Sequence, residues 1–310
     1  MKNNRQVHLS AVGFASIFGL SFMFSKIALR YIDPMGLIAY RYLIAFIIFE
    51  GLRLTKIVKI QFHRSMIKPV LIVSLFQPVL YFIFETNGIA RIKSSEAGMM
   101  IALIPIMVSL FSIVILKEKP KKIQWPFILM SVLGIIYIQF SNNRLNLSVD
   151  FLGYSLMGLA IISAALYNIY SRIASLKVSA ITLTYYMMII GAITFNTIYL
   201  IILGIKGNTH TYISNLTNLN ILGPILYLGI MASIIAFFLM NYALGKLEAH
   251  VTSIYSNLAT LMSIVAGVIF LNEKLYLYHY IGSALILIGV YGTVYFSKGV
   301  KRFTRKPKKI

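Results

Sequence analysis

Ten long apolar runs, separated by short polar segments, constrain the fold of this 310-residue chain more than any other feature. A helix needs about 20 apolar residues to cross the hydrocarbon core of a bilayer, and each run approaches or exceeds that length. The runs are apolar on nearly every side and do not alternate with period two, which predicts helices and not barrel strands. The ten runs are Val7–Leu29, Met35–Leu52, Pro69–Gly88, Ala97–Leu116, Ile123–Phe140, Phe151–Ser171, Ala180–Gly204, Ile221–Leu244, Val251–Leu271 and Tyr276–Phe296.

The composition excludes most soluble classes. Charged residues make up only 12% of the chain, whereas a soluble globular protein carries about 25%. The longest connections, residues 53–68 and 205–220, are too short and too polar to fold alone. We therefore expect an all-α membrane protein with ten transmembrane helices and no soluble domain, and the net charge of +21 must be explained within it.

Signatures of enzymes and cofactors are missing from the sequence. The chain has no cysteine, which removes disulfides, thiolate nucleophiles and iron–sulfur clusters. Its five histidines stand at run ends or in connections without metal-ligand spacing, and no phosphate-binding loop or nucleophile elbow occurs. We expect no enzyme activity, no cofactor or metal, and no nucleic-acid partner.

The basic residues predict the orientation of the helices. When the connections are assigned alternately to two sides, 21 of the 29 Lys and Arg residues fall on one side and 6 on the other, while Lys26 and Arg41 lie inside runs. Basic residues accumulate on the cytoplasmic side of short loops. The pattern predicts an even number of crossings of the cell (plasma) membrane and cytoplasmic termini, with a basic tail at 297–310 that faces anionic lipid.

An internal repeat divides the chain into two halves. The fourth run ends in Ile115-Leu116-Lys117-Glu118-Lys119, and the ninth ends in Phe270-Leu271-Asn272-Glu273-Lys274. Five crossings is an odd number, so a second copy must be inverted relative to the first. We predict two five-helix repeats, at 7–140 and 151–296. Inverted repeats are typical of secondary transporters, whose substrate site lies near the bilayer midplane between the halves.

Short motifs in both halves resemble the EamA-like family of the drug/metabolite transporter superfamily. The first half carries Phe18-Gly19-Leu20-Ser21-Phe22, Lys26, Pro34, Arg41, Asn87-Gly88, Ser95-Glu96-Ala97, Pro105 and Leu116-Lys117-Glu118, and the second carries Ala165-Leu166-Tyr167, Ser171-Arg172 and Leu271-Asn272-Glu273. The resemblance covers almost the whole chain. It implies a ten-helix, inverted-repeat carrier of small metabolites, often an exporter of amino acids or related compounds.

Charged residues inside membrane helices are functional candidates by default. Three such residues are Lys26, Arg41 and Glu85, and the predicted orientation places all three in the outer half of the bilayer. A cluster that is net positive would attract a substrate carboxylate, and protonation of Glu85 would couple transport to a proton gradient. The alternative is a structural Arg41–Glu85 ion pair, with Lys26 extended to the interface.

Polar residues in the middle of the runs form a second group of candidates. A proline inside a membrane helix frees a backbone carbonyl and often marks a helix break beside a cavity. In the third run, Pro78 follows Gln77. The alternative for this group is hydrogen bonding between helices. The substrate-binding candidates are Arg41, Gln77, Tyr81, Glu85, Tyr167, Asn168 and Asn257. Outside this set, Glu118 and Glu273 are expected to order turns or bind helix ends, and Glu50 to pair with Arg53.

These features favour a secondary transporter of small organic metabolites, such as an amino-acid exporter, that works by alternating access. Its partners are then a small-molecule substrate, the bilayer and protons. Efflux of hydrophobic cations or drugs is the alternative within transport, and Arg41 argues against it. A membrane scaffold or sensor without transport is the alternative from another class.

Overall fold

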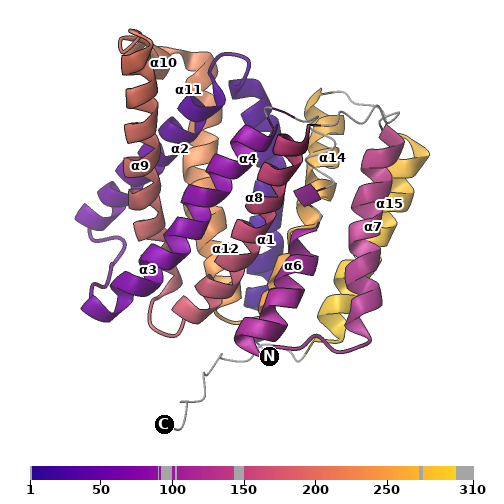
Figure 1. Cartoon of the computed structure of the whole chain (residues 1–310). Coiled ribbons are helices and arrows are strands. Elements are labelled where there is room, and N and C mark those ends of the chain that lie inside the picture. The colour runs from indigo at the N-terminus through magenta and orange to yellow at the C-terminus, as the bar shows by residue number, and fades with distance from the viewer. Residues whose placement is uncertain are drawn as a thin grey trace.

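The computed structural model describes residues 2–89, 91, 100–101, 103–142, 150–271 and 275–297. These residues form helices joined by short turns, and no strand occurs among them. Figure 1 shows the helices side by side in one bundle. Eight of the helical stretches are long and apolar enough to cross a membrane, and the stretches at 104–116 and 124–138 are apolar but shorter. The prediction of an all-α membrane protein is confirmed.

Most of the apolar runs correspond to one helix or to several consecutive helical segments. In the first half these are α1 (Lys2–Ala28), α2 (Pro34–Leu54), η1 (Arg64–Met66), α3 (Ile67–Ser74), η2 (Leu75–Leu80), α4 (Tyr81–Ile89), α6 (Ile104–Phe111), η3 (Ser112–Leu116) and α7 (Gln124–Asn142). The second half contains α8 (Phe151–Ala174), α9 (Ala180–Ile205), α10 (Thr211–Thr217), α11 (Leu219–Leu226), η4 (Tyr227–Ala236), α12 (Phe237–Leu244), α13 (Ala249–Tyr255), α14 (Leu258–Leu271) and α15 (Leu277–Tyr295).

Polar residues directly before the apolar runs fix where two long helices begin. The Asp33 carboxylate accepts a hydrogen bond from the Gly36 amide at 3.0 Å, and Pro34 occupies the first helical position of α2. The Ser179 hydroxyl accepts one from the Thr182 amide at 3.3 Å at the start of α9. Such caps satisfy amides that have no partner within the helix.

The third run is interrupted where the sequence places a proline. Gln77 has extended backbone angles, φ −150° and ψ 120°, between α3 and α4. Pro78 has no amide hydrogen to donate, so it cannot continue the helical hydrogen-bond pattern. The π-helical segment η2 surrounds this position. The break therefore divides one crossing into two helices, and it lies one turn before Tyr81.

Glycines bring α7 and α15 into direct backbone contact. A Cβ atom at Gly134 would lie 2.8 Å from the Gly282 carbonyl oxygen, and one at Gly289 would lie 2.5 Å from the Phe127 carbonyl oxygen. Small residues allow membrane helices to approach this closely, and packing rather than hydrophobic force then holds them together. The other closely packed pairs are α2 with α9, α1 with α14 and α4 with α8.

The connection between α9 and α11 contains the short helix α10, which aromatic residues hold against the bundle. The Tyr40 hydroxyl donates to the Tyr212 carbonyl at 2.7 Å, and the Tyr212 hydroxyl donates to the Asn196 side-chain oxygen at 2.7 Å. Burial raises the pKa of Tyr212, so the phenol stays protonated and able to donate. This connection is thus an ordered cap over one end of α2 and α9.

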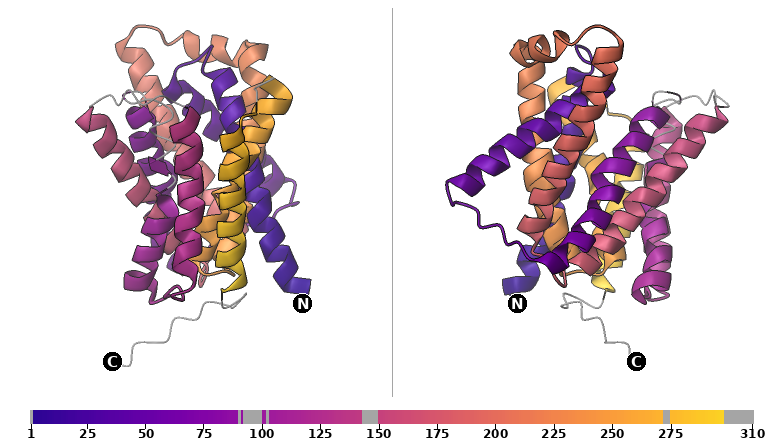
Figure 2. Two further views of the ribbon diagram at one scale, coloured as in Figure 1. Left: turned by 90° about the vertical axis from the view of Figure 1, so that its right-hand side faces the viewer. Right: turned by 60° about the vertical axis from the view of Figure 1, so that its left-hand side comes forward.

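The start of α1 and the end of α15 lie at the same end of the bundle (Figure 2). Figure 2 shows the start of α1 and the C-terminal end of α15 on one side in both views. An even number of crossings produces this arrangement.

Candidate functional site

Arg41 is buried in α2, two turns after the helix begins. Its Nε donates a hydrogen bond of 2.6 Å to the Ser233 hydroxyl in η4. The guanidinium also lies over the rings of Tyr42 and Phe82, 5.7 and 5.2 Å from their centroids. Contacts between a cation and an aromatic face contribute about 0.5 to 2 kcal/mol each. Burial of a charge costs several kcal/mol, so these contacts compensate only part of it.

No carboxylate within the described part of the chain lies within 4 Å of the Arg41 side chain. Its two terminal nitrogens donate no hydrogen bond to a described residue, yet they are not among the sealed polar atoms of the protein. They therefore face accessible space. A guanidinium with two free donors in one plane matches the geometry of a carboxylate or phosphate.

Tyr81 and Glu85 lie one turn apart on α4 and interact directly. The Tyr81 hydroxyl donates to the Glu85 carboxylate at 3.0 Å. Glu85 is half-buried, and it lies close enough to Arg41 for an electrostatic interaction without an ion pair. Gln77 precedes Tyr81 by one turn at the helix break and is also half-buried. The structure thus brings Arg41, Tyr81 and Glu85 together.

Tyr167 belongs to a separate buried network among three helices. Its hydroxyl donates to the Asn241 side-chain oxygen at 2.9 Å, and the Ser171 hydroxyl donates to the same oxygen at 2.7 Å. The Asn241 amide donates to the Thr184 hydroxyl at 3.0 Å. This network joins α8, α9 and α12 through donors and acceptors that satisfy one another. Helix packing therefore accounts for the buried Tyr167 hydroxyl.

The two candidate asparagines differ in what they contact. Asn257, in the turn between α13 and α14, donates to the Ser131 hydroxyl at 3.0 Å and so links this turn to α7. Asn168 donates to the Ala164 carbonyl of its own helix at 2.8 Å. The Asn168 side-chain oxygen is sealed without a hydrogen-bond partner among the described residues. This buried acceptor is therefore left without a hydrogen bond from the described part of the protein.

A buried ion pair between Glu118 and Arg172 ties four helix ends together on the side predicted to be cytoplasmic. The side chains are 11% and 3% exposed, and both Nε and a terminal nitrogen of Arg172 lie 2.6 Å from the same Glu118 oxygen. Arg172 also donates to the Leu244 carbonyl at 2.8 Å, while the second Glu118 oxygen accepts from the Ala249 amide at 3.2 Å. We call these four residues the lock.

The lock joins the ends of η3, α8 and α12 to the start of α13. The expectation that Glu118 binds a helix end is confirmed, as is the pairing of Glu50 with Arg53. Sequence reasoning missed the lock itself because Arg172 stands at a run end, where a basic residue usually faces lipid headgroups. The side chain of Lys26 and residues 272–274, which include Glu273, lie outside the described part of the structure.

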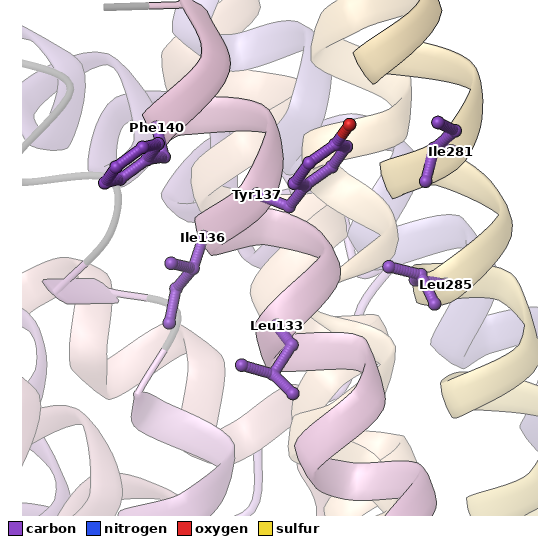
Figure 3. Close-up of a pocket in the computed structure, with 6 residues that line it drawn as sticks. All are labelled: Leu133, Ile136, Tyr137, Phe140, Ile281 and Leu285. Carbon is purple, nitrogen blue, oxygen red and sulfur yellow. The ribbon is translucent and has the colours of Figure 1, made fainter. Parts of the chain in front are cut away.

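An apolar groove lies elsewhere on the molecule. Figure 3 shows it between α7 and α15. Its volume is about 500 Å³. The lining residues are Leu133, Ile136, Tyr137, Phe140, Ile281 and Leu285. It holds no charged group, and its open, apolar surface matches a membrane protein's contact with acyl chains. Arg41 does not line this groove.

Comparison with known proteins places this arrangement in a family. The sequence profile of the EamA-like transporter family matches residues 6–140 and 151–295. The chain is 34% identical over 300 residues to the uncharacterized transporter YcxC of Bacillus subtilis, covering 97% of this chain and 95% of that protein. It is 26% identical over 276 residues to an uncharacterized transporter of Archaeoglobus fulgidus, covering 89% and 94%.

A solved crystal structure shares the fold. It superimposes with a TM-score of 0.76 at 16% sequence identity and covers 95% of this chain and 99% of the other. At that identity the likeness concerns the fold alone. The profile match over both halves and the long similarity to a named transporter establish the family. The chain belongs to the EamA-like transporter family and is a multi-pass membrane transporter.

Proposed function

We propose that the chain is a secondary transporter that exports a small organic metabolite with a carboxylate, such as an amino acid, by alternating access. The observation that carries this proposal is the buried Arg41 guanidinium, whose terminal nitrogens face accessible space with no carboxylate among the described residues to pair with. A substrate carboxylate supplies the missing compensation through two charge-assisted hydrogen bonds. Glu85 and Tyr81 then bind the amino group or a proton.

The transporter is proposed to consist of ten crossings in two inverted repeats, at 7–140 and 151–296, followed by a basic tail at 297–310. The helix packing supports this arrangement. If the two repeats are exchanged, the contact of α1 with α14 corresponds to the contact of α8 with α6. The contact of α4 with α8 likewise corresponds to the contact of α12 with α1. The α2–α9 and α7–α15 contacts each transform into themselves. A two-fold relation between the repeats requires such matched pairs.

A second sequence match supports the same repeats. Ser25-Lys26-Ile27-Ala28 precedes the cap Asp33, and Ser171-Arg172-Ile173-Ala174 precedes the cap Ser179. The spacing from the first serine to the cap is the same in both halves. By the distribution of basic residues, we place both termini on the cytoplasmic side of the plasma membrane.

The conformation described here is proposed to be closed toward the cytoplasm. Glu118 and Arg172 hold four helix ends from both halves at that face, and each is nearly sealed from solvent. Opening this face requires separation of the pair. The lock therefore acts as the cytoplasmic gate, and the Arg41 site is accessible from the other side.

A hydrophobic cation is the alternative substrate, and the rings around Glu85 favour it. Tyr81 donates to Glu85, and the Tyr81 and Phe82 rings meet edge to face with centroids 5.1 Å apart. A carboxylate beside aromatic faces can bind a cation. Arg41 within the same site opposes this, because a like charge repels the substrate.

Reconstituted proteoliposomes distinguish the two substrates. Uptake of a labelled amino-acid panel and of tetraphenylphosphonium is measured with and without a pH gradient, for the wild type, Arg41→Ala and Glu85→Gln. The proposal predicts that Arg41→Ala abolishes amino-acid transport and that Glu85→Gln removes stimulation by the gradient. Lys206→Ala, a change at an exposed residue after α9, is the matched control and leaves transport intact. Transport that is unchanged in both site variants contradicts the proposed site.

A further inference from the structure

Residues 54–68 run from the last residue of α2 through η1 to the start of α3, and they form an ordered strap with two different faces. Val58 and Ile60 are partly buried and pack against the hydrophobic core, and Met66 is fully buried. The Gln61 amide donates to the Thr182 hydroxyl in α9 at 3.4 Å. These contacts fix which side of the strap faces outward.

The outward face combines large apolar side chains with basic ones. Leu54, Ile57 and Phe62 are 65%, 72% and 66% exposed. The basic residues on the same segment are also exposed, and they are Lys56, Lys59, Arg64 and Lys68. Figures 1 and 2 show the C-terminal end of α2 leaning away from the other helices, with the strap returning from it to α3. The other described helices therefore do not cover these exposed side chains.

No carboxylate on the strap balances these charges. The sequence contains no Asp or Glu between Glu50 and Glu85. Glu50 itself is bound by Arg53 and accepts a hydrogen bond from the Tyr185 hydroxyl at 2.6 Å. The strap thus presents four basic residues without an internal counter-anion.

We propose that the strap is a binding surface for anionic phospholipid, with the headgroup phosphate on its basic residues and the acyl chains against Leu54, Ile57 and Phe62. A soluble anion would bind the charges but would leave the exposed apolar side chains in water. A zwitterionic lipid would cover the apolar side chains but would leave the surplus charge uncompensated. An anionic lipid satisfies both, as it does for basic segments at membrane surfaces.

Fluorescence quenching by brominated lipids tests this surface without any transport assay. The chain contains one tryptophan, Trp125, so Trp125→Phe with Phe62→Trp places a single reporter on the strap. The protein is reconstituted in vesicles of phosphatidylcholine with phosphatidylglycerol, with bromine on one lipid at a time. Each basic residue near an anionic surface contributes about fivefold to binding. We expect at least fivefold selectivity for phosphatidylglycerol at the reporter.

Two triple variants separate a site from overall charge. Lys56→Gln, Lys59→Gln and Arg64→Gln together should reduce the selectivity to below about twofold. The matched control neutralises Lys117, Lys119 and Lys121, which are exposed in the turn after η3 on the same side, and should retain it. Equal loss in both variants, or no selectivity in the wild type, overturns the proposal. Removal of the selectivity by excess inorganic phosphate assigns the site to a soluble anion and also overturns it.

Native mass spectrometry gives a second measurement that needs no tryptophan reporter. The wild type and the two triple variants are released from vesicles of equal lipid composition, and the phosphatidylglycerol molecules that remain bound are counted. We expect fewer bound molecules only in the strap variant. The same number in all three proteins contradicts the assignment, and neither result depends on whether Arg41 binds substrate.

Discussion

Removal of Arg172 should open the face of the protein that we propose to be cytoplasmic. Arg172→Ala deletes three hydrogen-bond contacts, two to a Glu118 oxygen at 2.6 Å and one to the Leu244 carbonyl at 2.8 Å. It leaves the Glu118 carboxylate nearly buried without its cation. Breaking a buried pair in this way costs about 3 to 5 kcal/mol. Water solvates Glu118 once the face opens, so the open state avoids this cost. We therefore expect the open state to be stabilised by about 3 kcal/mol relative to the closed state, which raises its population roughly 100-fold.

The absence of cysteine makes accessibility straightforward to measure. Ser253→Cys places a thiol on α13, just after the lock, at a residue that is fully buried in this structure. Its labelling by a hydrophilic maleimide is compared with and without Arg172→Ala. Labelling should become about 100-fold faster. Ser65→Cys, at an exposed position on the strap, is the matched control and should label at the same rate in both backgrounds.

A double variant checks the physical origin of this effect. Glu118→Gln with Arg172→Met removes both charges, so no unpaired ion stays buried, and the shift should be smaller than for Arg172→Ala alone. Size-exclusion chromatography confirms that each variant is folded. Unchanged labelling of Ser253→Cys in a folded Arg172→Ala protein would show that the pair does not hold the face closed.

Two further predictions concern stability and are checked by thermal unfolding in detergent. Gly289→Ala brings a Cβ atom 2.5 Å from the Phe127 carbonyl oxygen, so it should destabilise the fold by about 1 to 3 kcal/mol. Gly158→Ala is the control, because no atom lies within 4 Å of its Cβ position, and it should leave stability unchanged. Equal melting temperatures for the two variants would contradict the close α7–α15 contact. Tyr212→Phe removes the hydrogen bond to Asn196 and should cost about 1 kcal/mol, and an unchanged melting temperature would argue against the ordered cap.

The membrane class and helical fold were predictable because they depend on local properties of the chain. Apolar runs of about 20 residues leave the backbone no alternative to helices. The polar residues Asp33 and Ser179 stand directly before two of the runs, and they are where α2 and α9 begin. The helix break at Gln77 followed from the missing amide of the adjacent proline.

The partners of individual side chains were less predictable because they depend on packing between distant segments. Arg41 was expected near Glu85 and lies close enough for an electrostatic interaction, but its hydrogen-bond partner is Ser233, 192 positions further along the chain. Tyr167 was a candidate for substrate contact, and its hydroxyl is instead occupied by Asn241. A single sequence contains no signal for such pairs, since a serine or an asparagine inside an apolar run has many equivalent positions.

The proposed function depends on recognition of a carboxylate by Arg41, and discrimination between a carboxylate and its amide measures that recognition. Proteoliposomes with the wild type and with Arg41→Ala are assayed for uptake of whichever amino acid of the panel is transported, in competition with its unlabelled carboxamide. Two charge-assisted hydrogen bonds contribute about 3 kcal/mol. We expect the carboxamide to compete about 100-fold less well in the wild type, and we expect Arg41→Ala to lose this preference. Equal competition in the wild type, or full discrimination in Arg41→Ala, would contradict it.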